Sequence, residues 1–286
     1  MNRRDFLGTS IGAFTMFSLS GFKRISDDMP SSEKMPVLFV GHGNPMNGIE
    51  DNTFSRAWKK TALQIPKPTA ILCVSAHWLT KGTFVTAMER PKTIHDFGGF
   101  PAALFEKQYP ALGTPELAKE TSRLISKTTV GLDHDWGLDH GTWSVLAQMF
   151  PNADLPVYQL SIDFTKPPRW HYELATELKI LRSKGVLIVG SGNIVHNLGT
   201  VDWHGSAYPW AIEFDELSKR LIDSHDHDAL IDYEKLGVAA RLAIPTNEHY
   251  LPLLYSIALQ GSNEVHSFFS EETVMGSVSM RSLRIG

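Results

Sequence analysis

The sequence has almost no cysteine, because Cys73 is the only one among its 286 residues. A single cysteine cannot form an internal disulfide, and it also excludes a zinc site built from several cysteines. Cys73 lies within an apolar run, residues 70–74, where a cysteine usually serves as a small buried side chain. The one cysteine is therefore expected to be structural.

Clustered positive charge is also missing. The formal net charge is −4 and no basic patch interrupts the sequence, which argues against nucleic acid as a partner. Apolar residues make up 42% and charged residues 20% of the chain, as is ordinary for soluble globular proteins. This length and composition suit one large α/β domain or two small domains with a sizeable buried core.

Long hydrophobic runs are absent too, and the nearest candidate lies at the N-terminus. Residues 6–22 carry no charge, but the stretch is short and its Gly, Ser and Thr content is poor for a spanning helix. Arg3 and Arg4 precede it in a twin-arginine pattern. We interpret residues 1–29 as a twin-arginine export signal and the start of a linker, with a disordered or amphipathic leader as the alternative. The export machinery is then an expected partner, and the mature chain is expected to be periplasmic without a stable membrane span.

Strand-like apolar runs alternate with helical patterns after residue 30. The runs do not alternate with period two, as expected for strands that are covered on both faces. We therefore predict an α/β fold with helices on both faces of the sheet, formed by one catalytic domain over residues 30–286. The predicted strands are 35–40, 70–76, 83–87, 156–162, 186–190 and 278–285, and the predicted helices are 53–64, 114–126, 140–150, 169–184, 208–224 and 248–259.

Four of the twelve histidines stand where binding sites form in α/β sheets, near the ends of strands. His42 and His77 follow the first two predicted strands, and His196 follows the strand at 186–190 by a short loop. His249 opens a late helix. Imidazole is a common metal ligand, so four histidines that converge from distant segments predict a metal site. Each of them taken alone could instead be an ordinary turn residue.

Two further residues and one loop in the same regions of the sequence each have two possible roles. Glu248 is as plausible a metal ligand as its neighbour His249. His140 begins a predicted helix beside a carboxylate, and is either an acid–base group or a plain residue of the first helical turn. The glycine-rich loop with His95, Phe97 and Phe100 either lines a pocket for an aromatic substrate or packs on the surface.

Six separated motifs together resemble the 4,5-DOPA extradiol dioxygenases, a family of the class III extradiol ring-cleaving enzymes. The resemblance runs in the same order from about residue 35 to residue 286, outside the predicted export signal. It implies a single three-layer α/β/α domain with a mixed central sheet. The motifs that carry it are residues 41–46, 75–78, 95–101, 138–143, 192–198 and 248–252.

The resemblance also implies roles for the histidines. One divalent metal ion, zinc or ferrous iron, is expected to be held by His42, His77 and His249. His196 is expected to be a fourth ligand or an acid–base group, and His140 a catalytic histidine near the substrate. Many class III relatives have a glutamate as the third ligand, so the part played by Glu248 stays open here.

The activity that the resemblance implies is extradiol cleavage of a catechol such as DOPA, in which dioxygen is inserted next to the diol and a ring-opened semialdehyde is released. Two alternatives remain at this point. The same histidines could form a zinc-dependent hydrolase, although the sequence contains neither His-Glu-x-x-His nor Gly-x-Ser-x-Gly. The chain could also be a metal-binding interaction protein of the same fold without turnover.

Replacing the twin arginines tests the export signal. The double variant Arg3→Lys, Arg4→Lys is expected to leave folded enzyme in the cytoplasm, because the pair is read as an address and contributes nothing to the domain. Fractionation of cells into cytoplasm and periplasm, followed by immunoblotting, measures the distribution. Normal export of the double variant would exclude the twin-arginine interpretation.

Overall fold

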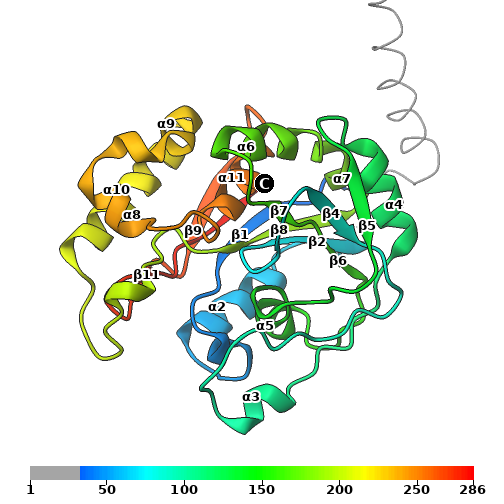
Figure 1. Ribbon diagram of the computed structural model, residues 1–286, viewed down its shortest axis with the longest axis horizontal. Coiled ribbons are helices and arrows are strands. Elements are labelled where there is room, and N and C mark those ends of the chain that lie inside the picture. The colour runs from blue at the N-terminus through cyan, green and yellow to red at the C-terminus, as the bar shows by residue number, and fades with distance from the viewer. Residues whose placement is uncertain (1–32) are drawn as a thin grey trace, which may run out of the picture.

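A six-stranded sheet forms the centre of the computed structural model, which describes residues 33–286 (Figure 1). Strands β6, β2, β8 and β1 run parallel, whereas β12 is antiparallel to β1 and β9 is antiparallel to β12. The sheet is therefore mixed, as predicted. Its strands are, in spatial order, β6 (Val157–Gln159), β2 (Ala70–Ser75), β8 (Val186–Gly192), β1 (Val37–Gly41), β12 (Ser282–Ile285) and β9 (His266–Phe269).

Successive side chains of the central strands enter two different cores. On β2, Leu72 belongs to one core and Ile71 and Cys73 belong to the other, since strand side chains alternate between faces. Helices α2 (Thr53–Ala62), α3 (Ala102–Glu106) and α5 (His140–Met149) contribute to the second core, below the sheet in Figure 1. The first core includes α4 (Pro115–Leu124), α6 (Pro168–Thr176), α7 (Lys179–Arg182), α8 (Pro209–Asp223), α10 (Val238–Ala243) and α11 (Leu251–Ala258). Helices thus cover both faces, which confirms the three-layer fold.

Three predicted elements are divided in the structure. The strand predicted at 156–162 ends at Gln159, and a second short strand, β7 (Ile162–Asp163), pairs with β3 (Leu79–Thr80) outside the central sheet. The helix predicted at 169–184 is divided into α6 and α7, and the last strand into β11 (Val278–Ser279) and β12. Apolar runs mark these segments as buried, but they do not show where hydrogen bonding changes partner.

Several short elements were not predicted, because they are too short to produce a periodic pattern. Strand β4 (Thr83–Thr86) was expected, but its partner β5 was not. The unpredicted elements include α3, β5 (Val130–Asp133), α9 (His227–Ile231), α10, β9 and β10 (Thr273–Val274).

The predicted export signal lies outside the described residues. Within residues 33–286, no helix combines the length and apolar character needed to span a bilayer.

Candidate metal centre

Parallel strands bring the predicted histidines to one edge of the sheet. Strands β1 and β8 pair in parallel up to Gly41 and Gly192, and β2 ends beside them at Ser75. His42 follows β1 directly, and His77 follows β2 by one residue. Their side chains therefore start from neighbouring strand ends, which is the expected location of a site in such a sheet.

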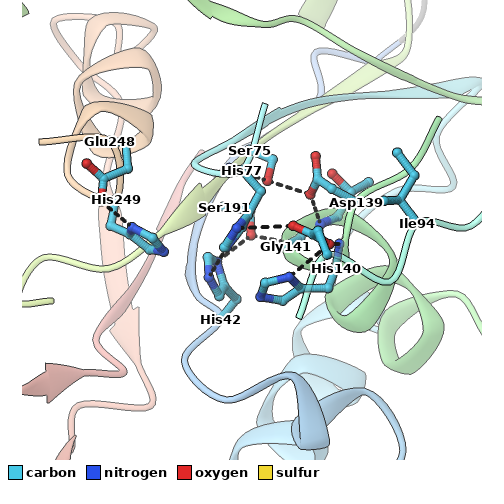
Figure 2. A network of polar contacts seen from close by, with 12 residues as sticks. His42, Ser75, His77, Ile94, Asp139, His140, Gly141, Ser191, Glu248 and His249 are labelled. Carbon is cyan, nitrogen blue, oxygen red and sulfur yellow. Dashed lines mark hydrogen bonds and ion pairs between the residues drawn. The ribbon is translucent and has the colours of Figure 1, made fainter. Parts of the chain in front are cut away.

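His249 reaches the same edge from a turn. Helix α11 begins at Leu251, three residues later than predicted, so that Glu248 and His249 precede it. The Asn193 backbone N–H donates to the His249 carbonyl oxygen at 2.8 Å, which ties this turn to the end of β8. Figure 2 shows His249 facing His42 and His77 from the side of α11.

The rings of His42, His77 and His249 form a nearly equilateral triangle. Their centroids are 5.0 Å apart for His42 and His77, 5.3 Å for His42 and His249, and 5.0 Å for His77 and His249. The Nε2 atoms of His42 and His77 are 3.1 Å apart. Two nitrogens at about 2.0–2.1 Å from one tetrahedral ion would be separated by a similar distance.

A hydrogen-bond acceptor lies behind the Nδ1 atom of each ring. Ser191 Oγ donates to the Gly141 carbonyl oxygen at 2.5 Å, so it accepts from His42 Nδ1 at 3.0 Å. Asp96 Oδ2 is 3.2 Å from His77 Nδ1. Glu248 Oε1 is 3.0 Å from His249 Nδ1.

These acceptors place a proton on Nδ1 and leave the lone pair on Nε2. Polar groups that orient metal-bound histidines in this way are usual around metal sites. The Glu248 carboxylate also accepts a hydrogen bond from the Thr246 hydroxyl group at 3.0 Å. Because the Glu248 carboxylate lies behind His249, at the Nδ1 atom, it is placed to orient the imidazole ring.

Burial keeps these imidazoles neutral. It lowers the pKa of His42 and His249 well below the ordinary value, and the neighbouring histidines lower both further. Burial also lowers the pKa of His77 to about 3, with repulsion from His140 as the next cause. Neutral rings offer lone pairs, so the donor set fits one divalent ion.

His140 lies closer to the pair formed by His42 and His77 than the sequence indicated. Nitrogen atoms of these three histidines all lie within 4.8 Å of one another, and His196, Glu248 and His249 form a second such group. The His140 backbone N–H donates to Asp96 Oδ1 at 2.9 Å, and His140 Nδ1 is 3.0 Å from the same oxygen. Asp96 thus joins the two histidines His77 and His140.

His196 lies against His249 with its ring nearly parallel. The two ring centroids are 3.5 Å apart and the planes differ by 11°. Its backbone N–H donates to the Ala243 carbonyl oxygen at 2.9 Å, which fixes the loop after β8. Burial lowers the pKa of His196 to about 4.

A cavity of about 240 Å³ opens over these histidines. Phe97 and Phe100 line it, and the Phe97 ring meets the edge of His140 at a centroid distance of 5.5 Å. His95, expected to contact the substrate, is not among the lining residues. Its Nε2 atom lies 2.9 Å from the Lys107 carbonyl oxygen and its ring packs against Phe97, so it supports the wall from behind.

The acceptors behind His42 and His77 were not predicted from the sequence, whereas Glu248 was expected near the site as a possible ligand. Asp96 stands within one of the quoted motifs but had no role, and Ser191 looked like an ordinary strand residue. Asp139 is also buried: it caps α5 by accepting from the Thr142 N–H and receives hydrogen bonds from Ser75 Oγ and Gln159 Nε2, both at 2.6 Å. Of these residues, only Asp139 could be recognised from the sequence, because an aspartate directly before a helix is typical of an N-cap.

The family comparison agrees with this geometry. Residues 35–280 match the model of the catalytic LigB subunit of aromatic ring-opening dioxygenase. The chain belongs to this family. The match explains why the six motifs occur in one order, and it makes the chain an oxidoreductase, a metal-dependent extradiol ring-cleaving dioxygenase.

Individual relatives extend over most of the chain. A 4,5-DOPA dioxygenase extradiol of Escherichia coli K12 is 48% identical over 271 residues, which cover 92% of this chain and 98% of the relative. The protein of the same name from Beta vulgaris is 37% identical, covering 79% and 87%. A crystal structure of an uncharacterized Escherichia coli K12 protein superposes with a TM-score of 0.77 at 45% identity, covering 88% of this chain and all of that one.

Alanine variants of His249 and His140 distinguish the two possible sets of ligands in this LigB-family enzyme. His249→Ala is expected to lower the metal affinity by more than roughly 100-fold, because a ligand is removed. Loss of a residue that only hydrogen-bonds to a ligand lowers the affinity by about 10- to 100-fold. His140→Ala is expected to keep about one ion per chain. Metal analysis after anaerobic purification gives the occupancy. The reverse pattern would move the third ligand from His249 to His140, and full occupancy in both variants would point to Glu248.

Proposed function

We propose that this enzyme cleaves a catechol such as DOPA next to its diol, with a single ferrous ion held by His42, His77 and His249. The observation that carries the proposal is the triangle of neutral imidazoles at the floor of a cavity with an aromatic wall. Relatives named 4,5-DOPA dioxygenase extradiol, up to 48% identical, support the choice of substrate class. Dioxygen is the second substrate.

The chain's own residues bind and orient the catechol. Phe97 and Phe100 offer the edge and face contacts that an aromatic ring prefers, so the ring lies between them and the histidines. The diol then faces the floor of the cavity. In the proposed site, a divalent ion supplies Lewis acidity toward the diol and, as ferrous iron, the redox chemistry that dioxygen needs, which zinc lacks.

Proton transfer falls to the two histidines outside the ligand triangle. His140 is held by Asp96, which fixes the ring beside the expected position of the diol. His196 stacks on His249 at the other side of the cavity. Each ring carries a nitrogen atom that can accept the diol proton and return one later. The lowered pKa of His196 keeps that ring in the neutral form that accepts a proton.

Export completes the proposal. The twin arginines Arg3 and Arg4 support delivery of the folded enzyme to the periplasm through the twin-arginine machinery.

The choice of metal decides whether the proposed reaction occurs. Protein purified without oxygen and loaded with ferrous iron is expected to take up dioxygen with L-DOPA and form a yellow ring-opened product. The zinc-loaded protein is expected to bind catechol without turnover, because zinc is redox-inactive. An oxygen electrode and absorption spectra measure both reactions. Ester hydrolysis by the zinc form, without oxygen uptake by the iron form, would support a hydrolase instead.

Substitution of His196 separates proton transfer from metal binding. His196→Gln is expected to retain most of the metal and to lose turnover by roughly two to four orders of magnitude, the range for a lost general acid–base group. Metal analysis and oxygen uptake on the same sample give both numbers, with His42→Ala as the control for a lost ligand. Metal loss as large as in that control would make His196 an essential ligand, and near-normal turnover would leave His140 as the acid–base group.

A further inference from the structure

The side of the cavity near its opening is apolar. Leu198, Trp203, Met275 and Val278 line it, together with the histidines of the floor. Leu198 and Trp203 are 61% and 60% exposed, so these two large side chains lie at the mouth, where they meet both the solvent and the cavity. Exposed aromatic and aliphatic side chains gathered at one opening indicate a contact surface for an apolar ligand group.

Positive charge is absent from this lining. Within residues 33–286, neither lysine nor arginine lines the cavity, and Asp96 is its only carboxylate. Arg281 is close in sequence to Val278, but its guanidinium group is buried and paired with Asp215, Glu216 and Glu271. Apart from the proposed metal ion, to which the diol would bind, a negatively charged ligand group would therefore find no cation among the lining residues and would share the cavity with the Asp96 carboxylate.

The proposed binding mode fixes where a ring substituent lies. With the diol at the histidine floor, a substituent on the far side of the ring points toward the mouth. There it would meet Trp203 and Leu198. A carboxylate held against these partly exposed apolar side chains would lose part of its hydration without gaining a cationic partner, whereas an uncharged chain would gain by covering apolar surface there.

We propose that this enzyme selects catechols whose ring substituent is uncharged and apolar, and that Trp203 is the residue that determines this preference. The proposal rests on the proposed ring-opening function and specifies its substrate class. Free DOPA, with a carboxylate and an ammonium group on its side chain, is then still cleaved, but with a higher KM than a catechol that carries an uncharged chain.

A matched pair of catechols tests the preference. 3-(3,4-Dihydroxyphenyl)propanoate and its methyl ester share the ring and the tether and differ in one negative charge. The iron-loaded enzyme is expected to show at least about tenfold higher kcat/KM for the ester, mainly through a lower KM, the scale by which a pocket rejects a poorly matched group. Equal values, or a preference for the acid, would overturn the proposal.

Neutral 4-methylcatechol keeps this test separate from that of the function itself. If the iron-loaded enzyme does not open its ring, the proposed function fails. If it does open this ring but does not distinguish the ester from the acid, only the present inference fails.

A charge introduced at the mouth tests the role of Trp203. Trp203→Arg is expected to reverse or abolish the preference, because the new guanidinium group can pair with the carboxylate at the mouth. Leu63→Arg is the matched control: Leu63 is 87% exposed at the end of α2, outside the cavity lining, and the same charge there should leave the ratio unchanged. Equal shifts in both variants would indicate general electrostatics, and an unchanged ratio in Trp203→Arg would exclude Trp203 as the determinant.

Discussion

The site depends on the hydrogen bonds that lie behind its histidines. Ser191, Asp96 and Glu248 each accept from an Nδ1 atom, which leaves the Nε2 atom of each ring with its lone pair, and the Nε2 atoms of His42 and His77 lie 3.1 Å apart. Without these acceptors, each ring could rotate or change tautomer, and the three lone pairs would not converge. Burial, which lowers the pKa values of the rings, keeps them neutral, so that a cation instead of protons can fill the space between them.

The backbone around the site is packed so closely that glycine is required at several positions. A Cβ atom on Gly192 would lie 2.1 Å from the His249 carbonyl oxygen, and one on Gly141 would lie 2.5 Å from Ser75 Oγ. Gly41 and Gly43 lie on either side of His42. The space beside both is filled by Met280 of the C-terminal segment, so they allow close packing of that segment against β1.

Much of the site follows from the sequence. His42 and His77 could be predicted because they follow buried strands, and parallel strands end at one edge. The acceptors behind His42 and His77 could not be predicted in this way, because they depend on contacts between separate segments: Ser191 is 149 residues from His42. Similarly, His95 and Phe97 lie in one glycine-rich loop, yet only Phe97 faces the cavity. The sequence shows that the loop is aromatic, whereas tertiary packing decides which side chain points inward.

The division of the histidines between metal binding and proton transfer is the central claim, and a crystal structure of the iron-loaded enzyme tests it most directly. Anomalous scattering at the iron edge locates the ion without assumptions about its ligands. We expect one peak, with the Nε2 atoms of His42, His77 and His249 at metal-bonding distances, about 2.0–2.2 Å, and His140 outside this range. A peak coordinated by His42, His77 and His140, with His249 distant, would contradict the account.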